Sequence, residues 1–202
     1  MSIPKVKTKS WTYLIAGLLI LSITGVLVLK MNKLHSTYKV GQPIDSLNGV
    51  YVYYNGEIDN VVELNETADK YLLGLKYQCV EFVKRYYYEH LNHKMPDAYG
   101  HAKDFYEVDL TDGQKSERRN LTQYQNPSQT KPKVDDLLIF GGTPANEYGH
   151  VAIISDVTDE KIEMIQQNPG PRGKSRETYL LERLNDKWVI KNERILGWLR
   201  KD

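Results

Sequence analysis

The most informative segment of this chain reads Tyr77-Gln78-Cys79-Val80-Glu81-Phe82-Val83-Lys84-Arg85, and it contains the only cysteine of the protein. This segment has the spacing of a helix. Steps of three and four positions place five residues on one helical face: Cys79, Phe82, Val83, Tyr86 and His90. A thiol in the first helical turn lies near unpaired amide N–H groups and the positive end of the helix dipole, which favour the nucleophilic thiolate. The alternative is that Cys79 is a small apolar residue on a packed helix face, as most lone cysteines are.

The composition limits the classes of protein that this chain can belong to. It has 202 residues, 41% of them hydrophobic, and a formal net charge of +1. A nearly balanced charge argues against a dedicated nucleic-acid-binding protein, which usually carries a basic excess. A single cysteine excludes an intramolecular disulfide, so packing must hold the fold together. We expect one domain with a substantial core after an N-terminal segment.

That N-terminal segment has the features of a membrane anchor. No charged residue lies between Lys9 and Lys30, and the apolar run from Trp11 to Leu29 is just long enough to cross a hydrocarbon core of about 30 Å. A cleaved signal peptide is the competing interpretation, but the run is long for one and no small-residue cleavage site follows. We therefore predict a flank at residues 1–10, a transmembrane helix at 11–29, a linker at 30–44 and a domain at 45–202.

The orientation of this anchor follows only weakly from the flanking lysines. Three lysines precede the span and three follow it, and those before it lie closer together. This spacing favours a cytoplasmic amino terminus, with the domain in the periplasm or at the cell surface.

Within residues 45–202, helical and strand patterns follow one another in blocks. A strand at residues 50–54 precedes the Cys79 helix, which is expected to end near Leu91. The polar segment from Asp109 to Lys133 is predicted to be a long loop, either functional or mobile. Apolar runs then predict strands at residues 137–140, 150–157, 161–166, 188–190 and 195–199. This order predicts an α+β domain with N-terminal helices packed on an antiparallel sheet.

Among five histidines, His150 is the best candidate partner for the thiol. It directly follows Gly149 and opens a predicted strand, which places its imidazole at a sheet rim that a helix start can face. A structural histidine is the alternative. His90 and His93 lie near the helix end, but no cysteine or carboxylate has the spacing to complete a zinc site with them. We therefore predict no metal and no cofactor.

A general base also needs a group that orients its second ring nitrogen. The strand after His150 ends in Gln166-Gln167-Asn168. If these two strands form a hairpin, Gln166 lies beside His150, and Asn168 shares one strand face with Gln166 because the two are two positions apart. An amide oxygen fixes the imidazole tautomer but supplies no full negative charge.

These motifs together resemble the CHAP domain, the cysteine- and histidine-dependent amidohydrolase/peptidase family. The resemblance rests on Gly74 to Arg85, on Gly149-His150-Val151-Ala152-Ile153-Ile154, and on Gln166-Gln167-Asn168. It extends over roughly residues 45–200. Within this family, the chain most resembles the amidase domain of glutathionylspermidine synthetase/amidase. It implies a papain-like α+β fold of the CHAP/NlpC-P60 type.

The resemblance also implies a mechanism and a set of site residues. Cys79 would attack an amide carbonyl, His150 would activate the thiol and protonate the leaving amine, and an acyl-enzyme would be hydrolysed. The backbone N–H of Cys79 and the side chain of Gln78 are the candidate oxyanion donors, with Gln166 and Asn168 as orienting residues. Three positions depart from the family pattern: Gln166 replaces a common Glu, Asp135 a common Gly, and Lys84 an Arg of the nearer relatives.

Three functions follow from these observations. The first is a membrane-anchored thiol amidase that acts on a small peptide-like amide such as glutathionylspermidine. The second is a peptidoglycan amidase or endopeptidase that acts on muropeptides, which gains weight if the domain faces outward. The third is a catalytically weakened CHAP binding module, which the replacement by Gln166 favours. None of the three involves nucleic acid.

Overall fold

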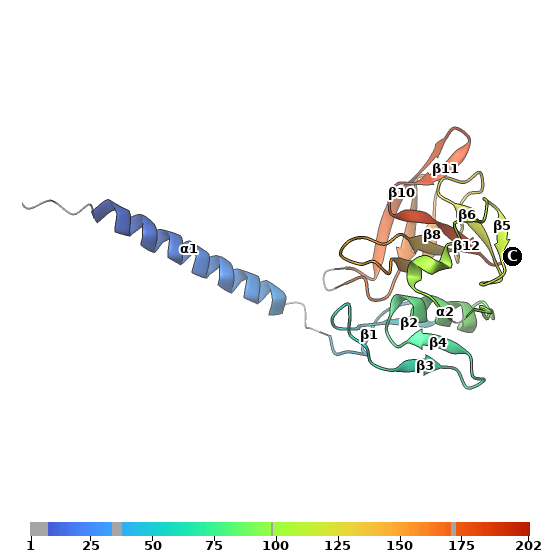
Figure 1. The fold of residues 1–202 in the computed structure, drawn as a ribbon, viewed down its shortest axis with the longest axis horizontal. Coiled ribbons are helices and arrows are strands. Elements are labelled where there is room, and N and C mark those ends of the chain that lie inside the picture. Colours follow the sequence, from blue (N-terminus) through green and yellow to red (C-terminus); the bar gives the residue numbers. More distant parts are fainter. Residues whose placement is uncertain (1–7, 34–37, 98, 171–172) are drawn as a thin grey trace, which may run out of the picture. The chain divides into compact units, whose positions relative to one another are not determined.

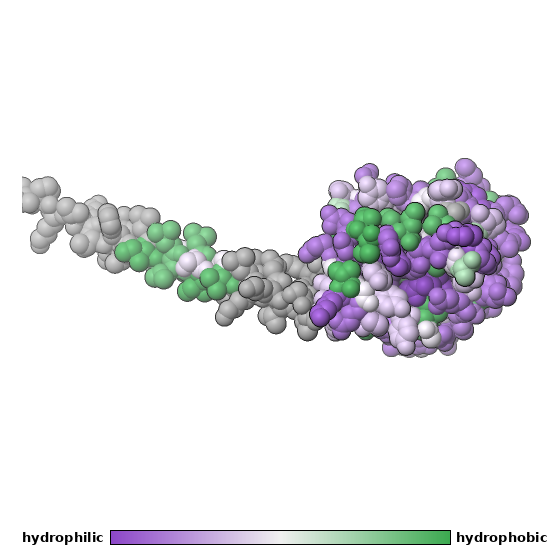
Figure 2. Space-filling model, turned by 90° about the horizontal axis from the view of Figure 1, so that it is seen from below, coloured by the Kyte–Doolittle hydropathy of each residue, from purple (hydrophilic) through white to green (hydrophobic). Residues whose placement is uncertain are grey.

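The computed structural model describes residues 8–33, 38–97, 99–170 and 173–202. The chain divides into two compact units, Met1–Tyr38 and Lys39–Asp202. The first unit contains a helix, α1 (Thr8–Lys33), whose described apolar side chains between Tyr13 and Val26 are exposed (Figure 2). Helix α1 includes the first residues of the predicted linker, and residues 34–37 of that linker lie outside the described residues.

The transmembrane helix predicted at residues 11–29 is not supported. In the described parts of the chain, no helix has both the length and the apolar character needed to cross a membrane.

The second unit contains a large sheet, two small hairpins and few helices (Figure 1). The first hairpins and the main helix are β1 (Pro43–Leu47), β2 (Val50–Tyr53), β3 (Leu64–Glu66), β4 (Leu72–Leu75) and α2 (Cys79–Glu89). A 3₁₀ turn, η1 (Ala102–Phe105), leads into the strands of the sheet. These are β5 (Gln114–Ser116), β6 (Leu121–Gln125), β7 (Leu137–Phe140), β8 (His150–Val157), β9 (Lys161–Ile165), β10 (Arg176–Leu184), β11 (Lys187–Ile190) and β12 (Ile195–Arg200).

The eight strands of the large sheet follow the order β11-β10-β9-β8-β7-β12-β6-β5, and every neighbouring pair is antiparallel. Helix α2 packs against β8 near the middle of this sheet and also contacts β2 and β4. An antiparallel sheet with few helices agrees with the predicted α+β class. Instead of several N-terminal helices, however, the described residues before the sheet form one full α-helix in this unit and the two hairpins.

Two apolar clusters fill the two faces of the sheet. Alternate residues of β7 point to opposite sides, so Leu137 and Ile139 join the cluster that covers α2, while Leu138 and Phe140 join the other. Helix α2 contributes Phe82 to the first cluster. Burial on both sides explains why β7 reads as a continuous apolar run in the sequence.

The loop predicted between Asp109 and Lys133 is wrong, because this segment contains β5 and β6. Gln123 is fully buried there, and Arg119 is 1% exposed with its guanidinium 3.8 Å from the centre of the Phe105 ring. Such burial of polar residues is invisible to a hydropathy pattern. Strand β10 was also missed, because charged residues interrupt its apolar pattern and Leu181 is its one buried residue.

A buried ion pair holds the last strand of the sheet to the start of β7. Arg200 donates from two nitrogens to Asp136 at 2.8 and 2.7 Å, and the backbone N–H of Lys133 donates to the same carboxylate at 2.7 Å. Burial raises the pKa of Asp136, and the Arg200 guanidinium opposes that shift. The pair is therefore costly to form, and breaking it leaves Arg200 with an uncompensated charge.

We expect Asp136→Ala to lower the free energy of unfolding by about 3–5 kcal/mol, because an unpaired charge then remains in the interior. Denaturant unfolding followed by circular dichroism measures this loss. The matched control is Asp159→Ala, which removes the 91% exposed partner of Lys131 and should leave the unfolding midpoint unchanged. An equal loss in both variants would contradict the role given to burial.

Candidate active site

The candidate site forms where the start of α2 meets the start of β8. Cys79 is the first residue of α2 and is half-buried. Its thiol has a backbone hydrogen bond with Val151, the residue that directly follows His150. The structure thus brings the predicted nucleophile to the strand that begins with the predicted base.

Two backbone features allow the start of α2 and the start of β8 to lie this close together. Tyr77 has a positive φ of 65°, which turns the chain sharply between β4 and α2. Gly149 has a φ of 74°, and a Cβ at this position would lie 2.5 Å from the carbonyl oxygen of Phe140. Only glycine fits this turn, so the position before His150 is dictated by sterics.

Gln166 is the side chain that orients His150. Its Nε2 donates to the carbonyl oxygen of Lys174 at 2.8 Å and to Glu177 Oε1 at 3.2 Å. With both amide hydrogens directed to these acceptors, the Gln166 oxygen accepts the side-chain hydrogen bond from His150. The bond with Gln166 fixes the imidazole tautomer and leaves the other ring nitrogen of His150 as the basic one.

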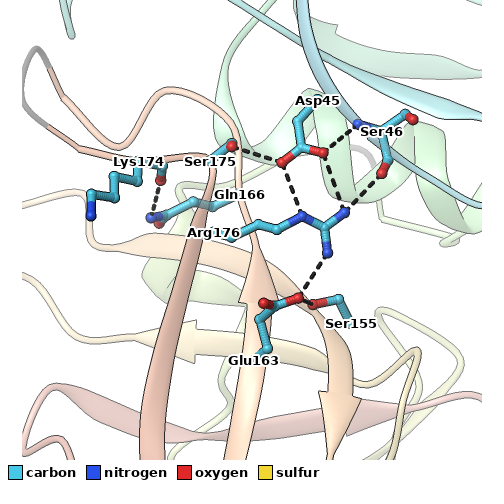
Figure 3. A network of polar contacts seen from close by, with 8 residues as sticks. All are labelled: Asp45, Ser46, Ser155, Glu163, Gln166, Lys174, Ser175 and Arg176. Atoms are coloured by element: carbon cyan, nitrogen blue, oxygen red, sulfur yellow. Dashed lines mark hydrogen bonds and ion pairs between the residues drawn. The ribbon is translucent and has the colours of Figure 1, made fainter.

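A polar network fixes the carbonyl that holds Gln166 (Figure 3). Arg176, at the start of β10, donates to Asp45 of β1 at 3.0 Å and to Glu163 of β9 at 2.8 Å. Gln166 donates to Lys174, two residues before Arg176, in the same view. The ion pairs therefore tie the returning chain to the first hairpin and hold the Lys174 carbonyl beside Gln166.

Asn168 has a different partner from Gln166. Strand β9 ends at Ile165, and Asn168 has a positive φ of 53°, so the regular alternation of a strand does not continue to it. Its Nδ2 donates to Gln78 Oε1 at 2.7 Å and to the Ile58 carbonyl at 2.8 Å. The shared strand face expected from the sequence is therefore wrong, and Asn168 orients Gln78 rather than His150.

Gln78 precedes the nucleophile as the N-cap of α2. Its Nε2 donates to the Asn60 carbonyl at 2.9 Å and to the Ile58 carbonyl at 3.4 Å, while its oxygen accepts from Asn168. Both amide hydrogens thus have protein acceptors, and an oxyanion would have to replace the longer of the two bonds.

The sequence did not identify Gln167, although it braces the start of α2. This residue is fully buried, accepts the Tyr53 N–H at 2.7 Å and donates to Glu81 Oε2 at 2.9 Å and the Gln78 carbonyl at 3.1 Å. Glu81 in turn accepts from Arg85 at 2.6 Å. The one signal in the sequence for this network was its partner Glu81, because a carboxylate in the first turn of a helix stabilises the helix start.

The three departures from the family pattern now have structural explanations. Asp135 has a φ of 75°, a conformation that explains the common glycine at this position. Lys84 is fully buried, donates to the Leu72 carbonyl and lies 4.8 Å from the centre of the Tyr71 ring. Burial, assisted by Arg119, lowers the pKa of Lys84 to about 8. Lys84 therefore belongs to the core. Gln166 retains its contact with His150.

A pocket of about 270 Å³ lies on the His150 side of the site. Its described lining includes His150 but not Cys79. Glu177 and Arg194 give the wall both signs of charge, and Gln166 adds a neutral amide. Apolar residues complete the wall, among them Ile58, Phe140 and Met164.

Burial makes the resting thiol and imidazole neutral. Loss of hydration raises the pKa of Cys79 to about 11, against the opposing hydrogen bonds with Val151, Val80 and its own backbone. Loss of hydration also lowers the pKa of His150 to about 4, assisted by Arg194 and opposed by Gln166 and Glu177. Both shifts oppose the thiolate expected at the helix start, since desolvation disfavours the charged forms.

The structure thus places a cysteine at a helix start near a histidine at a strand start, the pairing that a thiol-dependent hydrolase needs. Residues 70–168 match the CHAP domain family. The chain therefore contains a CHAP domain, the cysteine- and histidine-dependent amidohydrolase/peptidase family, and the predicted family is confirmed.

Two curated relatives agree with the narrower resemblance. Trypanothione synthetase of Crithidia fasciculata is 31% identical over 100 residues, and glutathionylspermidine synthase of the same organism is 32% identical over 105 residues. The matches cover 50% and 48% of this chain but only 15% and 14% of those relatives. A solved structure, "The crystal structure of Ly7917", aligns at 15% identity with a TM-score of 0.38, over 62% of this chain and 53% of that chain.

The neutral resting pair predicts how Cys79 reacts with iodoacetamide. Because the thiol pKa is raised to about 11, alkylation of the substrate-free protein at pH 7 should be slower than that of a free cysteine. The rate should rise with pH until the thiol ionises near pH 11. Mass spectrometry of the modified protein over pH 5–10 measures the profile, with the unfolded chain as control. Fast alkylation that is independent of pH between 5 and 8 would instead indicate a thiolate–imidazolium pair.

Proposed function

We propose that this protein is a thiol amidohydrolase that cleaves an amide bond through a Cys79 acyl-enzyme. The observation that carries the proposal is the contact of the Cys79 thiol with Val151, beside a histidine that is bound to Gln166. Together with the CHAP match, this contact supports a papain-like arrangement of the two reacting groups.

The neutral pair implies general-base catalysis. As Cys79 Sγ attacks the substrate carbonyl, the ring nitrogen of His150 that is not bound to Gln166 takes the thiol proton, and the imidazolium then gives it to the leaving amine. Water attacks the acyl-enzyme in the second half of the reaction and loses its proton to the same nitrogen. Gln166 holds the tautomer that leaves this nitrogen free throughout.

The oxyanion is stabilised at the start of α2. The backbone N–H of Cys79 belongs to the first turn of the helix, where amide groups have no intrahelical acceptor. The Gln78 amide is the other donor, with the oxyanion in place of the Ile58 carbonyl, which is 3.4 Å from Nε2. The bond from Asn168 to Gln78 Oε1 orients that amide. Asn168 thus acts on the oxyanion site.

We place a glutathionylspermidine-like conjugate first among the substrates. Two observations support this choice: the match to trypanothione synthetase and glutathionylspermidine synthase, and the pocket beside His150 that contains both Glu177 and Arg194. A wall with both charges suits a peptide-like substrate that carries an amine and a carboxylate.

Muropeptides are the competing substrates, because the CHAP family also includes peptidases. That function requires the domain to face the cell wall, and the extracytoplasmic location stays a prediction. An orientation reporter fused to the carboxyl terminus tests this location.

The decisive experiment incubates the full chain with glutathionylspermidine and, separately, with muropeptides, and identifies products by mass spectrometry. We expect cleavage of the first substrate, and a loss of about 10²–10⁴-fold in kcat for Cys79→Ser and for His150→Gln, which remove the nucleophile and the base. The matched control is His90→Gln, at the opposite end of α2.

Each outcome assigns the function differently. Cleavage of muropeptides alone would indicate that the protein is a peptidoglycan amidase or endopeptidase. Cleavage of neither substrate, or full activity of Cys79→Ser, would contradict the proposal and favour a binding module.

A further inference from the structure

We infer that Glu177 is a positioning residue that acts on His150 through Gln166 and supplies the negative charge that the Gln166 amide lacks. The inference rests on the proposed function, since it concerns how the base of that site is oriented. It assigns a role to a carboxylate on β10, a strand that was not expected from the sequence.

The geometry forms a continuous chain of hydrogen bonds away from the imidazole. His150 donates to the Gln166 oxygen, and Gln166 Nε2 donates to Glu177 Oε1 at 3.2 Å. The other oxygen of Glu177 accepts from the Tyr179 hydroxyl at 2.6 Å. The antiparallel pairing of β10 with β9 places Glu177 opposite Met164, two residues before Gln166. Backbone register therefore fixes the carboxylate beside the amide.

This series of hydrogen bonds has two effects on the Gln166 amide. Glu177 and the Lys174 carbonyl both require hydrogen donors, so they hold the amide nitrogen away from His150 and its oxygen toward the imidazole. A donor bonded to a carboxylate also makes its amide more polarised, which strengthens the bond at the amide oxygen. A neutral amide that is held in this way imitates an orienting carboxylate.

Among the described residues, two charged side chains act on the charge of His150. Arg194, just before β12, disfavours the imidazolium, and Glu177 on β10 favours it, while burial disfavours a charge on Cys79 of α2. Without Glu177, no acid among these described groups would oppose the cation of Arg194. The imidazolium that forms during catalysis would then lose its nearest compensating charge.

The same geometry explains why glutamine occupies position 166. A glutamate there would place a second carboxylate about 3.2 Å from Glu177 and an oxygen against the Lys174 carbonyl. Two such carboxylates do not both ionise, so one of them would retain a proton. Gln166→Glu alone should therefore give no gain in activity, although it restores the residue common in the family.

The test compares Glu177→Gln with Glu182→Gln, a substitution on the same strand whose carboxylate pairs with Lys191 at 3.5 Å. We expect Glu177→Gln to lower kcat by about tenfold, the effect of one pKa unit on the base. The melting temperature should stay unchanged. In ¹⁵N NMR of the substrate-free protein at pH 7, the His150 tautomer whose proton lies on the nitrogen bound to Gln166 should lose population. Glu182→Gln should match the parent in each measurement.

An exchange of the two side chains provides the rescue. The double variant Gln166→Glu with Glu177→Gln places a single carboxylate at position 166, beside His150. It should recover most of the kcat that Glu177→Gln loses. Three results would overturn the inference: unchanged NMR and kcat in Glu177→Gln, equal losses in Glu182→Gln, or a kcat above the parent in Gln166→Glu alone.

The NMR measurement needs no substrate, so it separates this inference from the proposed function. If the parent cleaves neither substrate, the tautomer population still reports whether Glu177 orients His150. Cleavage without any tautomer change in Glu177→Gln would leave the amidase standing and remove the role of Glu177.

Discussion

The site depends on one contact, the packing of the first turn of α2 against the first residues of β8. It brings the Cys79 thiol to the backbone of Val151 and so to the neighbourhood of His150. The contact needs a glycine before His150, because a side chain there would collide with the Phe140 carbonyl. Gln167 and Glu81 hold the helix start in place from the other side with a buried network.

Burial has two opposite consequences at this contact. It brings nucleophile and base together in a dry environment, where each hydrogen bond is stronger than in water. It also disfavours charge on both groups, which explains the raised pKa of Cys79 and the lowered pKa of His150. The protein counters the second effect at a distance, through an amide that is oriented by a carbonyl and a carboxylate rather than through a carboxylate in direct contact with the histidine.

The segment between β9 and β10 contacts two of the proposed site residues. It carries Gln166 toward the histidine and Asn168 toward Gln78, and Arg176 binds it to Asp45 in the first hairpin. One short stretch of chain thus contacts both the proposed base and the proposed oxyanion donor. This division of labour follows from the end of β9 at Ile165 and from the positive φ of Asn168.

The sequence by itself determined the family, the helix that begins at Cys79, the strand that begins at His150 and the antiparallel character of the domain. These features are local, since helix spacing, apolar runs and glycine positions are written into neighbouring residues. Only the tertiary structure decided the roles of Gln167 and Glu177, the burial of Lys84 and Arg119, and the separate directions of Gln166 and Asn168. Each of these depends on a partner distant in the chain, so no local pattern encodes it. The charge state of the thiol depends on desolvation in the same way, because only the packed structure removes water from it.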